Sequence, residues 1–258
     1  RSQVVVGPKV DGVTPSATER PRTAEELAAR LKEAAAAGQA VIPVGGGRAL
    51  GLGDPPSRFD VALETQGLDR IVEHSHADLV VTVEAGVTLE RLNQHLGRAG
   101  QLLPLDPLGG PGHTVGGALA AALTGPLRLG YGSARDFLIG LRVALPDGTL
   151  ASSGGRVVKN VSGYDMGKLH HGALGSLGVI VTASFKLYPQ PLAEATVVVR
   201  PASAEEAWRE AARALELPAR PVALALERST EGFLLRARLT GSGDAVAHYP
   251  VVYRLSMR

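Results

Sequence analysis

In the segment Ile42-Pro43-Val44-Gly45-Gly46-Gly47-Arg48-Ala49, three successive glycines follow a short apolar run. Residues 40–44 have the pattern of a buried strand. Because glycine adopts backbone conformations that side chains forbid, several N–H groups of residues 45–47 can point at one anion, such as a pyrophosphate. No Gly-Lys-Ser/Thr follows, so the segment is not a mononucleotide P-loop. A flexible surface turn is the other interpretation.

A second glycine-rich segment lies some 60 residues further on. Leu105-Asp106-Pro107 leads to Gly109-Gly110-Pro111-Gly112-His113-Thr114-Val115-Gly116-Gly117, and residues 115–123 form a small, apolar helical pattern. The free N–H groups and positive dipole end of such a helix would face the same anion from the other side. The two segments together predict a diphosphate between them. Alternatively, Thr114 only caps a helix whose glycines allow close packing.

The remaining pattern predicts an α+β fold of two unequal parts. Residues 1–191 form the larger domain, because Pro189 and Pro191 mark the clearest boundary in the chain. Residues 192–258 form a short cap with a helix at 204–215 and strands near Val222, Phe233 and Val251. In the larger domain we expect helices at 23–38, 88–100 and 115–123, strands at 40–44, 59–64, 70–74, 79–84 and 178–187, a hairpin of 137–145 with 149–152, and a short helix ending at His171.

Composition excludes several classes of function. The 27 Lys and Arg residues nearly balance the 25 Asp and Glu residues, so nucleic acid is not an expected partner. The chain has no cysteine, which excludes a disulfide, a thiol nucleophile and an iron–sulfur cluster of its own. No apolar stretch reaches the roughly 20 residues of a membrane helix, so we expect a cytoplasmic protein without a transmembrane segment.

These motifs, taken in order, resemble the FAD-binding domain of the vanillyl-alcohol oxidase or p-cresol methylhydroxylase (PCMH) type, over about residues 23–191. Further marks are Gly132 with Asp136, the run from Val158 to Asp165, and Gly175-Ser176-Leu177-Gly178-Val179-Ile180. The resemblance implies a two-subdomain FAD-binding domain followed by a reduced α/β cap. It implies a cofactor site made of Pro43, Gly45, Gly46, Gly47, Arg48, Ala49, Leu105, Asp106, Pro107, Thr114, Val115, Gly116, Gly117, Gly178 and Val179.

Within this family the chain is most similar to the FAD-binding E subunit of the bacterial glycolate oxidase group. The run from Lys159 to Asp165 has the E-subunit form, and Leu174 stands where the larger members carry an acidic residue. The cap lacks their His-rich Gly-Asp-Gly-Asn segment. Arg48 occupies a position where many relatives attach the flavin through histidine, so the resemblance implies FAD that is not covalently bound.

Several other residues have two interpretations. His113 either reaches a flavin or substrate carboxylate, or is an exposed loop residue. Lys159 and Tyr164 either hold the flavin edge or a substrate acid group, or fix their loop to the core. His74 and His76 are expected at the surface, and His170-His171 are not expected to bind a metal because adjacent side chains diverge. No residue is assigned as a catalytic base.

The resemblance implies an FAD-binding subunit of a complex that oxidises a small 2-hydroxy acid such as glycolate. The expected partners are a catalytic FAD subunit and an iron–sulfur subunit, which could hold the chain at the inner membrane. One alternative is a stand-alone FAD-dependent oxidase or dehydrogenase of another small substrate. The other is a non-catalytic assembly subunit that has lost the flavin.

Overall fold

The fold is taken from a computed structural model that describes residues 13–155, 165–216, 220–244 and 246–247. The chain divides into two compact units. The first comprises residues 1–103, 107–123 and 134–188, and the second comprises 104–106, 124–133 and 189–258. The sequence-based division had assigned both short segments of the second unit to the first domain, and the domain bounds 1–191 and 192–258 stay a prediction.

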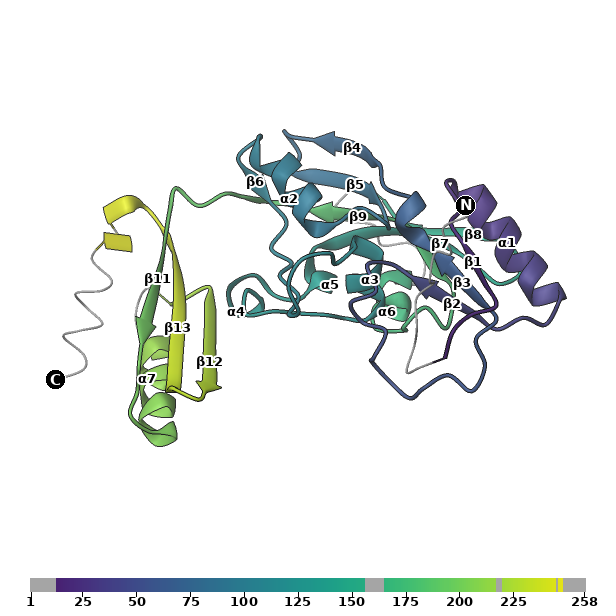
Figure 1. The fold of residues 1–258 in the computed structure, drawn as a ribbon. Helices are drawn as coiled ribbons and strands as arrows, with labels where there is room; N and C mark the ends of the chain where they lie inside the picture. The colour runs from purple at the N-terminus through teal and green to yellow at the C-terminus, as the bar shows by residue number, and fades with distance from the viewer. Residues whose placement is uncertain (1–12, 156–164, 217–219, 245, 248–258) are drawn as a thin grey trace, which may run out of the picture. The chain divides into compact units, whose positions relative to one another are not determined.

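The first unit begins with a small parallel sheet and a helix (Figure 1). Thr23 caps helix α1 because its side-chain oxygen accepts a hydrogen bond from the N–H of Glu26 at 3.1 Å. The apolar side of α1, including Leu27 and Leu31, is buried in one core cluster with Leu63 and Val181. The elements are α1 (Ala24–Ala36) and strands β1 (Ala17–Glu19), β2 (Val41–Val44) and β3 (Val61–Glu64), in the order β1-β3-β2.

The same unit contains a five-stranded antiparallel sheet in the order β4-β5-β9-β7-β8. Alternation along β9 buries Val181, Ala183 and Phe185 on one side, whereas Thr182 and Ser184 are half-buried on the other. Helix α3 packs on β9 and β5, which places the start of this helix beside the sheet. The strands are β4 (Ile71–Ser75), β5 (Val80–Glu84), β7 (Leu138–Ala144), β8 (Leu150–Gly154) and β9 (Val179–Lys186).

Short elements lie between or after the strands of these two sheets along the chain. Helix α2 begins after Thr88, whose side-chain oxygen accepts a hydrogen bond from the N–H of Arg91. Strand β6 follows α2 and pairs with β10. The connecting elements are the 3₁₀ helix η1 (Thr65–Gly67), α2 (Leu89–Gly97), β6 (Gln101–Leu102), α3 (Val115–Ala120), α5 (Ala134–Phe137), α6 (Met166–His170) and β10 (Tyr188–Pro189).

The second unit is a three-stranded antiparallel sheet with a helix against it. Its strands are β11 (Ala193–Val199), β12 (Ala223–Ser229) and β13 (Gly232–Gly241), in the order β11-β13-β12. Helix α7 (Ala204–Glu216) buries Ala214 in a cluster with Leu239 of β13. A short helix, α4 (Arg128–Tyr131), contacts β12 in this unit, where the Gly130 N–H donates to Val222 O at 3.0 Å.

The predicted mixture of helices and sheets is confirmed, with boundaries shifted by a few residues. Strand β11 was not predicted, because Ala193–Val199 follows a proline pair that reads as a linker. The strand expected near Val251, and the loop with Lys159 and Tyr164, lie outside the described residues. Among the described residues, no helix combines the length and apolar character that crossing a membrane requires.

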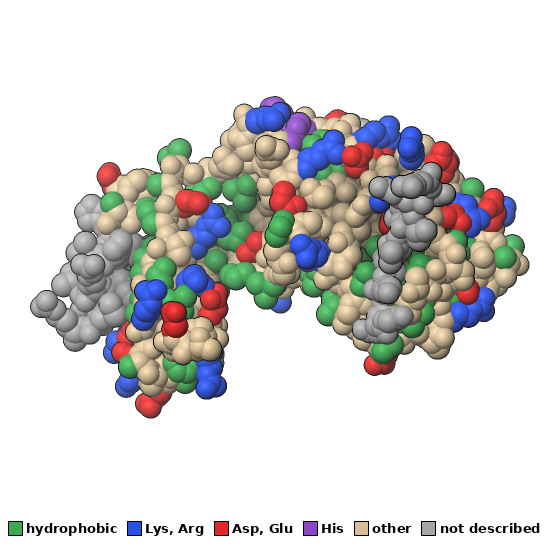
Figure 2. All heavy atoms as spheres, viewed as in Figure 1, with side chains coloured by type: hydrophobic (Ala, Val, Ile, Leu, Met, Phe, Trp, Pro, Cys, Tyr) green, Lys and Arg blue, Asp and Glu red, His purple; other side chains and the backbone are tan. Residues whose placement is uncertain are grey.

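Three histidines meet where β4, α2 and β6 lie. Because Gln101 Oε1 is an acceptor, His74 donates from Nε2 to it at 2.8 Å, and His74 Nδ1 then accepts from His95 Nε2 at 3.2 Å. The expectation that both histidines lie at the surface is met in full by His76, which is exposed, and in part by His74, which is half-buried. Figure 2 shows histidine (purple) beside Lys or Arg side chains (blue) at the top of the surface in this view.

We expect this corner to make stability depend on pH. Burial lowers the pKa of His95 below 6.5, and the positive charges of His74, Arg98 and His76 add to the effect. A lowered pKa in the folded state gives stability that is present above the unfolded pKa and is lost as the pH falls from there through the folded pKa. In melting curves between about pH 8 and pH 5, His95→Gln should reduce the slope of melting temperature against pH. Equal slopes for wild type and variant would contradict this expectation.

Candidate functional site

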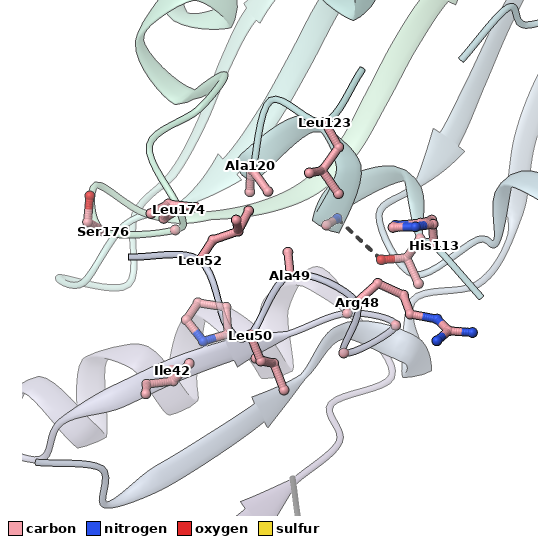
Figure 3. A pocket seen from close by; sticks show the side chains of 18 of the residues that line it. Ile42, Arg48, Ala49, Leu50, Leu52, His113, Ala120, Leu123, Leu174 and Ser176 are labelled. Carbon is pink, nitrogen blue, oxygen red and sulfur yellow. Dashed lines mark hydrogen bonds between the residues drawn. The ribbon is translucent and has the colours of Figure 1, made fainter. Parts of the chain in front are cut away.

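The first unit contains a cavity of about 450 Å³ with walls from three separate segments (Figure 3). One wall is the glycine loop after β2, the second is His113 to Leu123 with helix α3, and the third is the turn before β9. Its lining is mainly backbone and apolar side chains. The lining residues are Val41, Ile42, Pro43, Gly45, Gly46, Gly47, Arg48, Ala49, Leu50, Leu52, Asp54, Pro56, His113, Thr114, Gly117, Ala120, Ala121, Leu123, Leu174, Gly175 and Ser176.

The first two walls touch at glycines. A Cβ atom on Gly46 would lie 1.7 Å from the carbonyl oxygen of Gly112, and one on Gly45 would lie 2.2 Å from Thr114 Oγ1. Gly47 has a φ of 70°, which favours glycine. The N–H groups of Gly45, Gly46 and Gly47 have no hydrogen-bond partner within the part of the chain that the structure describes. A cluster of unpaired N–H groups at a cavity wall can bind an anion.

The second wall is fixed by hydrogen bonds to the segment that directly follows strand β5. The N–H of Val115 donates to Val87 O at 2.9 Å, and that of Gly116 donates to Ala85 O at 2.8 Å. The N–H of Gly117 donates to the buried Thr114 Oγ1 at 3.2 Å. The expected free N–H groups at the start of α3 are therefore engaged within the chain. This wall therefore shapes the cavity and lets the chain segments approach closely, but its bonded N–H groups are not free to bind an anion.

Two side chains hold the loop before α3. Arg48 donates from Nε to the carbonyl oxygen of Pro111 at 2.7 Å, and Glu90 accepts the N–H of Gly112 at 3.0 Å. His113 is buried, and its Nε2 lies 3.0 Å from Leu108 O. The interpretation of His113 as an exposed loop residue is wrong. Because Leu108 O is an acceptor, His113 donates from Nε2, which leaves the imidazole in a structural bond.

The third wall is the turn at residues 172–176. The N–H of Leu174 donates to Ala120 O at 2.8 Å, which attaches the turn to the end of α3. A Cβ atom on Gly175 would lie 3.0 Å from Pro43 Cγ, so the turn also packs on β2. These contacts bring residues 43, 120 and 174 together, although they are far apart in the sequence.

The structure brings most, but not all, predicted site residues together. Pro43, Gly45, Gly46, Gly47, Arg48, Ala49, Thr114 and Gly117 line the main cavity. Gly116 and Val179 line an adjoining cavity of about 50 Å³ that shares Pro43, Gly45 and Gly117. Gly178 and Val179 line a third cavity, of about 200 Å³, that also includes Pro43. Val115 is fully buried in the core. None of these cavities is lined by Leu105, Asp106 or Pro107.

Asp106 has a structural contact inside the second unit. Its carboxylate accepts the N–H of Leu127 at 3.0 Å, and a Cβ atom on Gly125 would lie 1.8 Å from the Asp106 carbonyl oxygen. Burial raises the pKa of the Asp106 carboxyl above its usual value of 3.8. These contacts fix the turn at residues 124–127.

The apolar part of the cavity was not predicted from the sequence. Ile42, Leu50, Leu52, Ala120, Leu123 and Leu174 line it, and each of them reads as an ordinary core or loop residue in the sequence. The small residues of α3 were a usable signal, since they predict a helix packed against a sheet or a ligand. Nothing comparable marks Leu52 or Leu174.

The chemistry available at the walls is that of binding. The polar side chains among the described lining residues are those of Arg48, Asp54, His113, Thr114 and Ser176. Arg48, His113 and Thr114 each bond to the chain itself. No pair of carboxylates lines the cavity, so the described walls offer no general acid and base acting together. These walls offer backbone N–H groups that are unpaired within the described chain, which can bind an anion, beside apolar side chains, which can contact an apolar group.

Comparison with known proteins gives an independent view of the chain. A sequence model of the family described as "FAD binding domain" matches residues 15–166. The chain is 40% identical to glycolate oxidase subunit GlcE of Escherichia coli over 143 residues, which are 55% of this chain and 41% of that protein. It is 32% identical to mitochondrial D-lactate dehydrogenase (cytochrome) 1 of Saccharomyces cerevisiae over 194 residues, which are 72% of this chain and 33% of that protein.

The chain thus spans about two fifths or less of the length of these relatives. A solved structure of alkyldihydroxyacetonephosphate synthase superposes with a TM-score of 0.75. That likeness covers 92% of this chain and 49% of the other, at 18% identity, and so shows a shared fold.

Proposed function

Because the chain belongs to the FAD-binding domain family, we propose that the cavity between Gly45–Gly47 and α3 holds one FAD and serves the oxidation of a 2-hydroxy acid. One observation carries the proposal. Three glycines whose N–H groups have no partner among the described residues line a cavity of about 450 Å³, and most of the other lining residues are apolar. A dinucleotide needs both features, since its pyrophosphate is anionic and its rings are flat and largely apolar.

Each group of cavity residues can be given a part in binding FAD. The N–H groups of Gly45, Gly46 and Gly47 would bind the pyrophosphate, and Arg48 holds the neighbouring loop while adding positive charge. Thr114 and Gly117 set how closely α3 approaches. When bound, FAD supplies the hydride acceptor for the acid. The chain supplies position and shelter from water, and it has no cysteine through which a flavin could be attached.

We further infer that the chain acts as an FAD-binding subunit beside a catalytic FAD subunit and an iron–sulfur subunit. The 40% identity to a glycolate oxidase subunit supports this, as does the lack of cysteine for a cluster in this chain. On this proposal residues 1–191 bind FAD and residues 192–258 form a reduced cap. The predicted site residues that line the cavities would surround the cofactor, namely Pro43, Gly45, Gly46, Gly47, Arg48, Ala49, Thr114, Gly116, Gly117, Gly178 and Val179.

An absorption spectrum of the purified chain, with and without added FAD, tests the cofactor part. We expect a yellow protein that releases intact FAD on denaturation, as non-covalent binding requires. A colourless preparation that takes up no FAD would contradict the proposal and favour an assembly subunit without flavin. Glycolate oxidation by the isolated chain with an artificial electron acceptor would contradict only the subunit role.

We expect Arg48→Ala to weaken FAD binding roughly tenfold, the effect of losing one charge-assisted hydrogen bond. The variant removes the bond from Arg48 Nε to Pro111 O, and with it the tie between the two loops. Titration with FAD, followed by flavin fluorescence, measures the effect. Arg58→Ala is the matched control, because Arg58 also donates to a backbone carbonyl, that of Gly38, outside the cavity. Equal affinities in both variants would rule out the role of Arg48.

A further inference from the structure

Leu174 has a backbone conformation that its side chain disfavours. Its φ is 52°, and the neighbouring Gly172 and Gly175 have φ values of 82° and 78°. In this left-handed region a Cβ atom crowds the following carbonyl group, which is why glycine prevails there. The turn is therefore left-handed at three positions, and leucine stands at one of them. A glycine at residue 174 would fit the same turn without strain.

The side chain of Leu174 faces the cavity. It lines both the main cavity and the adjoining smaller one, and its N–H bond to Ala120 O fixes where it starts. Figure 3 shows it near Leu52 and Ala120, pointing into the same space. Leu174 Cδ1 would lie 3.8 Å from a Cβ atom on Gly53, so the turn and the loop after β2 approach each other here.

Leu174 remains 50% exposed despite these contacts. Contacts within the described chain therefore bury only part of this side chain. Strained non-glycine residues that persist at a cavity wall are typical of ligand contacts. An aromatic ring that covers the exposed half would complete the burial of the side chain.

We propose that Leu174 is the apolar contact on which a planar ring of FAD lies, and that the left-handed backbone is kept to present it. The inference rests on the proposed function, because it takes FAD as the occupant of the cavity. Both the adenine and the isoalloxazine ring have the flat, apolar surface that Leu174 would cover, and the choice of probe separates them.

The test compares Leu174→Ala and Leu174→Gly. Both remove the ring contact, so we expect each to raise the dissociation constant of FAD roughly tenfold. Only glycine removes the strain, so the FAD-free Leu174→Gly protein should melt at a higher temperature than FAD-free Leu174→Ala. That order is the reverse of the usual one for alanine and glycine. Leu79→Gly is the control, since Leu79 has a φ of 55° and does not line the cavity.

The outcomes separate the possible failures. Unchanged FAD affinity in both Leu174 variants would overturn the inference while the proposed function stands. Wild-type protein that binds no FAD would instead overturn the proposed function, and with it the inference. If FAD affinity falls, titration with ADP identifies the ring. A parallel loss for ADP assigns adenine to Leu174, and an unchanged ADP affinity assigns isoalloxazine.

Discussion

Replacing Gly46 with alanine is expected to lower the affinity for FAD by roughly a hundredfold, which corresponds to about 2.7 kcal/mol. The added Cβ atom would lie 1.7 Å from the carbonyl oxygen of Gly112 and 2.9 Å from its carbon. Both contacts are with backbone, so no side chain can rotate away. The two loops must separate, which moves the N–H groups of residues 45–47 away from α3. FAD titration by flavin fluorescence measures the loss.

Gly51→Ala is the control for this prediction. Gly51 lies in the same loop, has no positive φ, and a Cβ atom there would meet nothing within 4 Å. We expect it to bind FAD like the wild type. If Gly46→Ala retained wild-type affinity, contact between these two loops would not matter for binding. If Gly51→Ala lost as much affinity, the loss would come from glycine content in the loop rather than from the contact.

Substitutions of two neighbouring glycines in α3 should affect stability and cofactor binding differently. Gly117 lines the main cavity, and a Cβ atom there would lie 3.0 Å from Thr114 Oγ1. Alanine favours a helix over glycine by about 1 kcal/mol, so Gly117→Ala should leave the free energy of unfolding unchanged or raise it. The new methyl group enters the cavity, and we expect the affinity for FAD to fall roughly tenfold.

Gly116→Ala, in contrast, should lower the free energy of unfolding. Its Cβ atom would lie 2.7 Å from Ala85 Cβ and 3.1 Å from the Ala85 carbonyl oxygen, so helix α3 must move away from the strand side of the unit. Overpacking of this kind lowers the free energy of unfolding by about 2 kcal/mol. Urea unfolding of the FAD-free variants gives the comparison. A stability loss in Gly117→Ala as large as in Gly116→Ala would show that both glycines serve only packing.

Local patterns were enough to predict many of the elements. Thr23 and Thr88 cap the helices that the sequence predicts after them, and the turn at residues 146–148 joins β7 and β8 as an antiparallel pair. These features depend on residues only a few positions apart, so the local sequence is enough to predict them. The family resemblance and the FAD-binding fold class are confirmed. The roles assigned to individual site residues stay predictions.

Other expectations failed because they depend on distant contacts. The N–H groups at the start of α3 looked free in the sequence, yet Val87 O and Ala85 O accept two of them. His113 looked exposed, yet it is buried against its own loop. In each case the partner is a backbone carbonyl, whose position a sequence does not reveal.

The sequence by itself determined that two glycine-rich loops exist, that one follows a strand and the other starts a helix, and that cysteine chemistry is excluded. Glycine and proline act through the local backbone, so their consequences appear within a few residues. Only the tertiary structure decided that Gly46 meets Gly112, that Arg48 reaches Pro111, and that Leu174 completes an apolar wall. Such contacts join segments that are tens of residues apart, and packing selects among the many pairings that a local pattern allows.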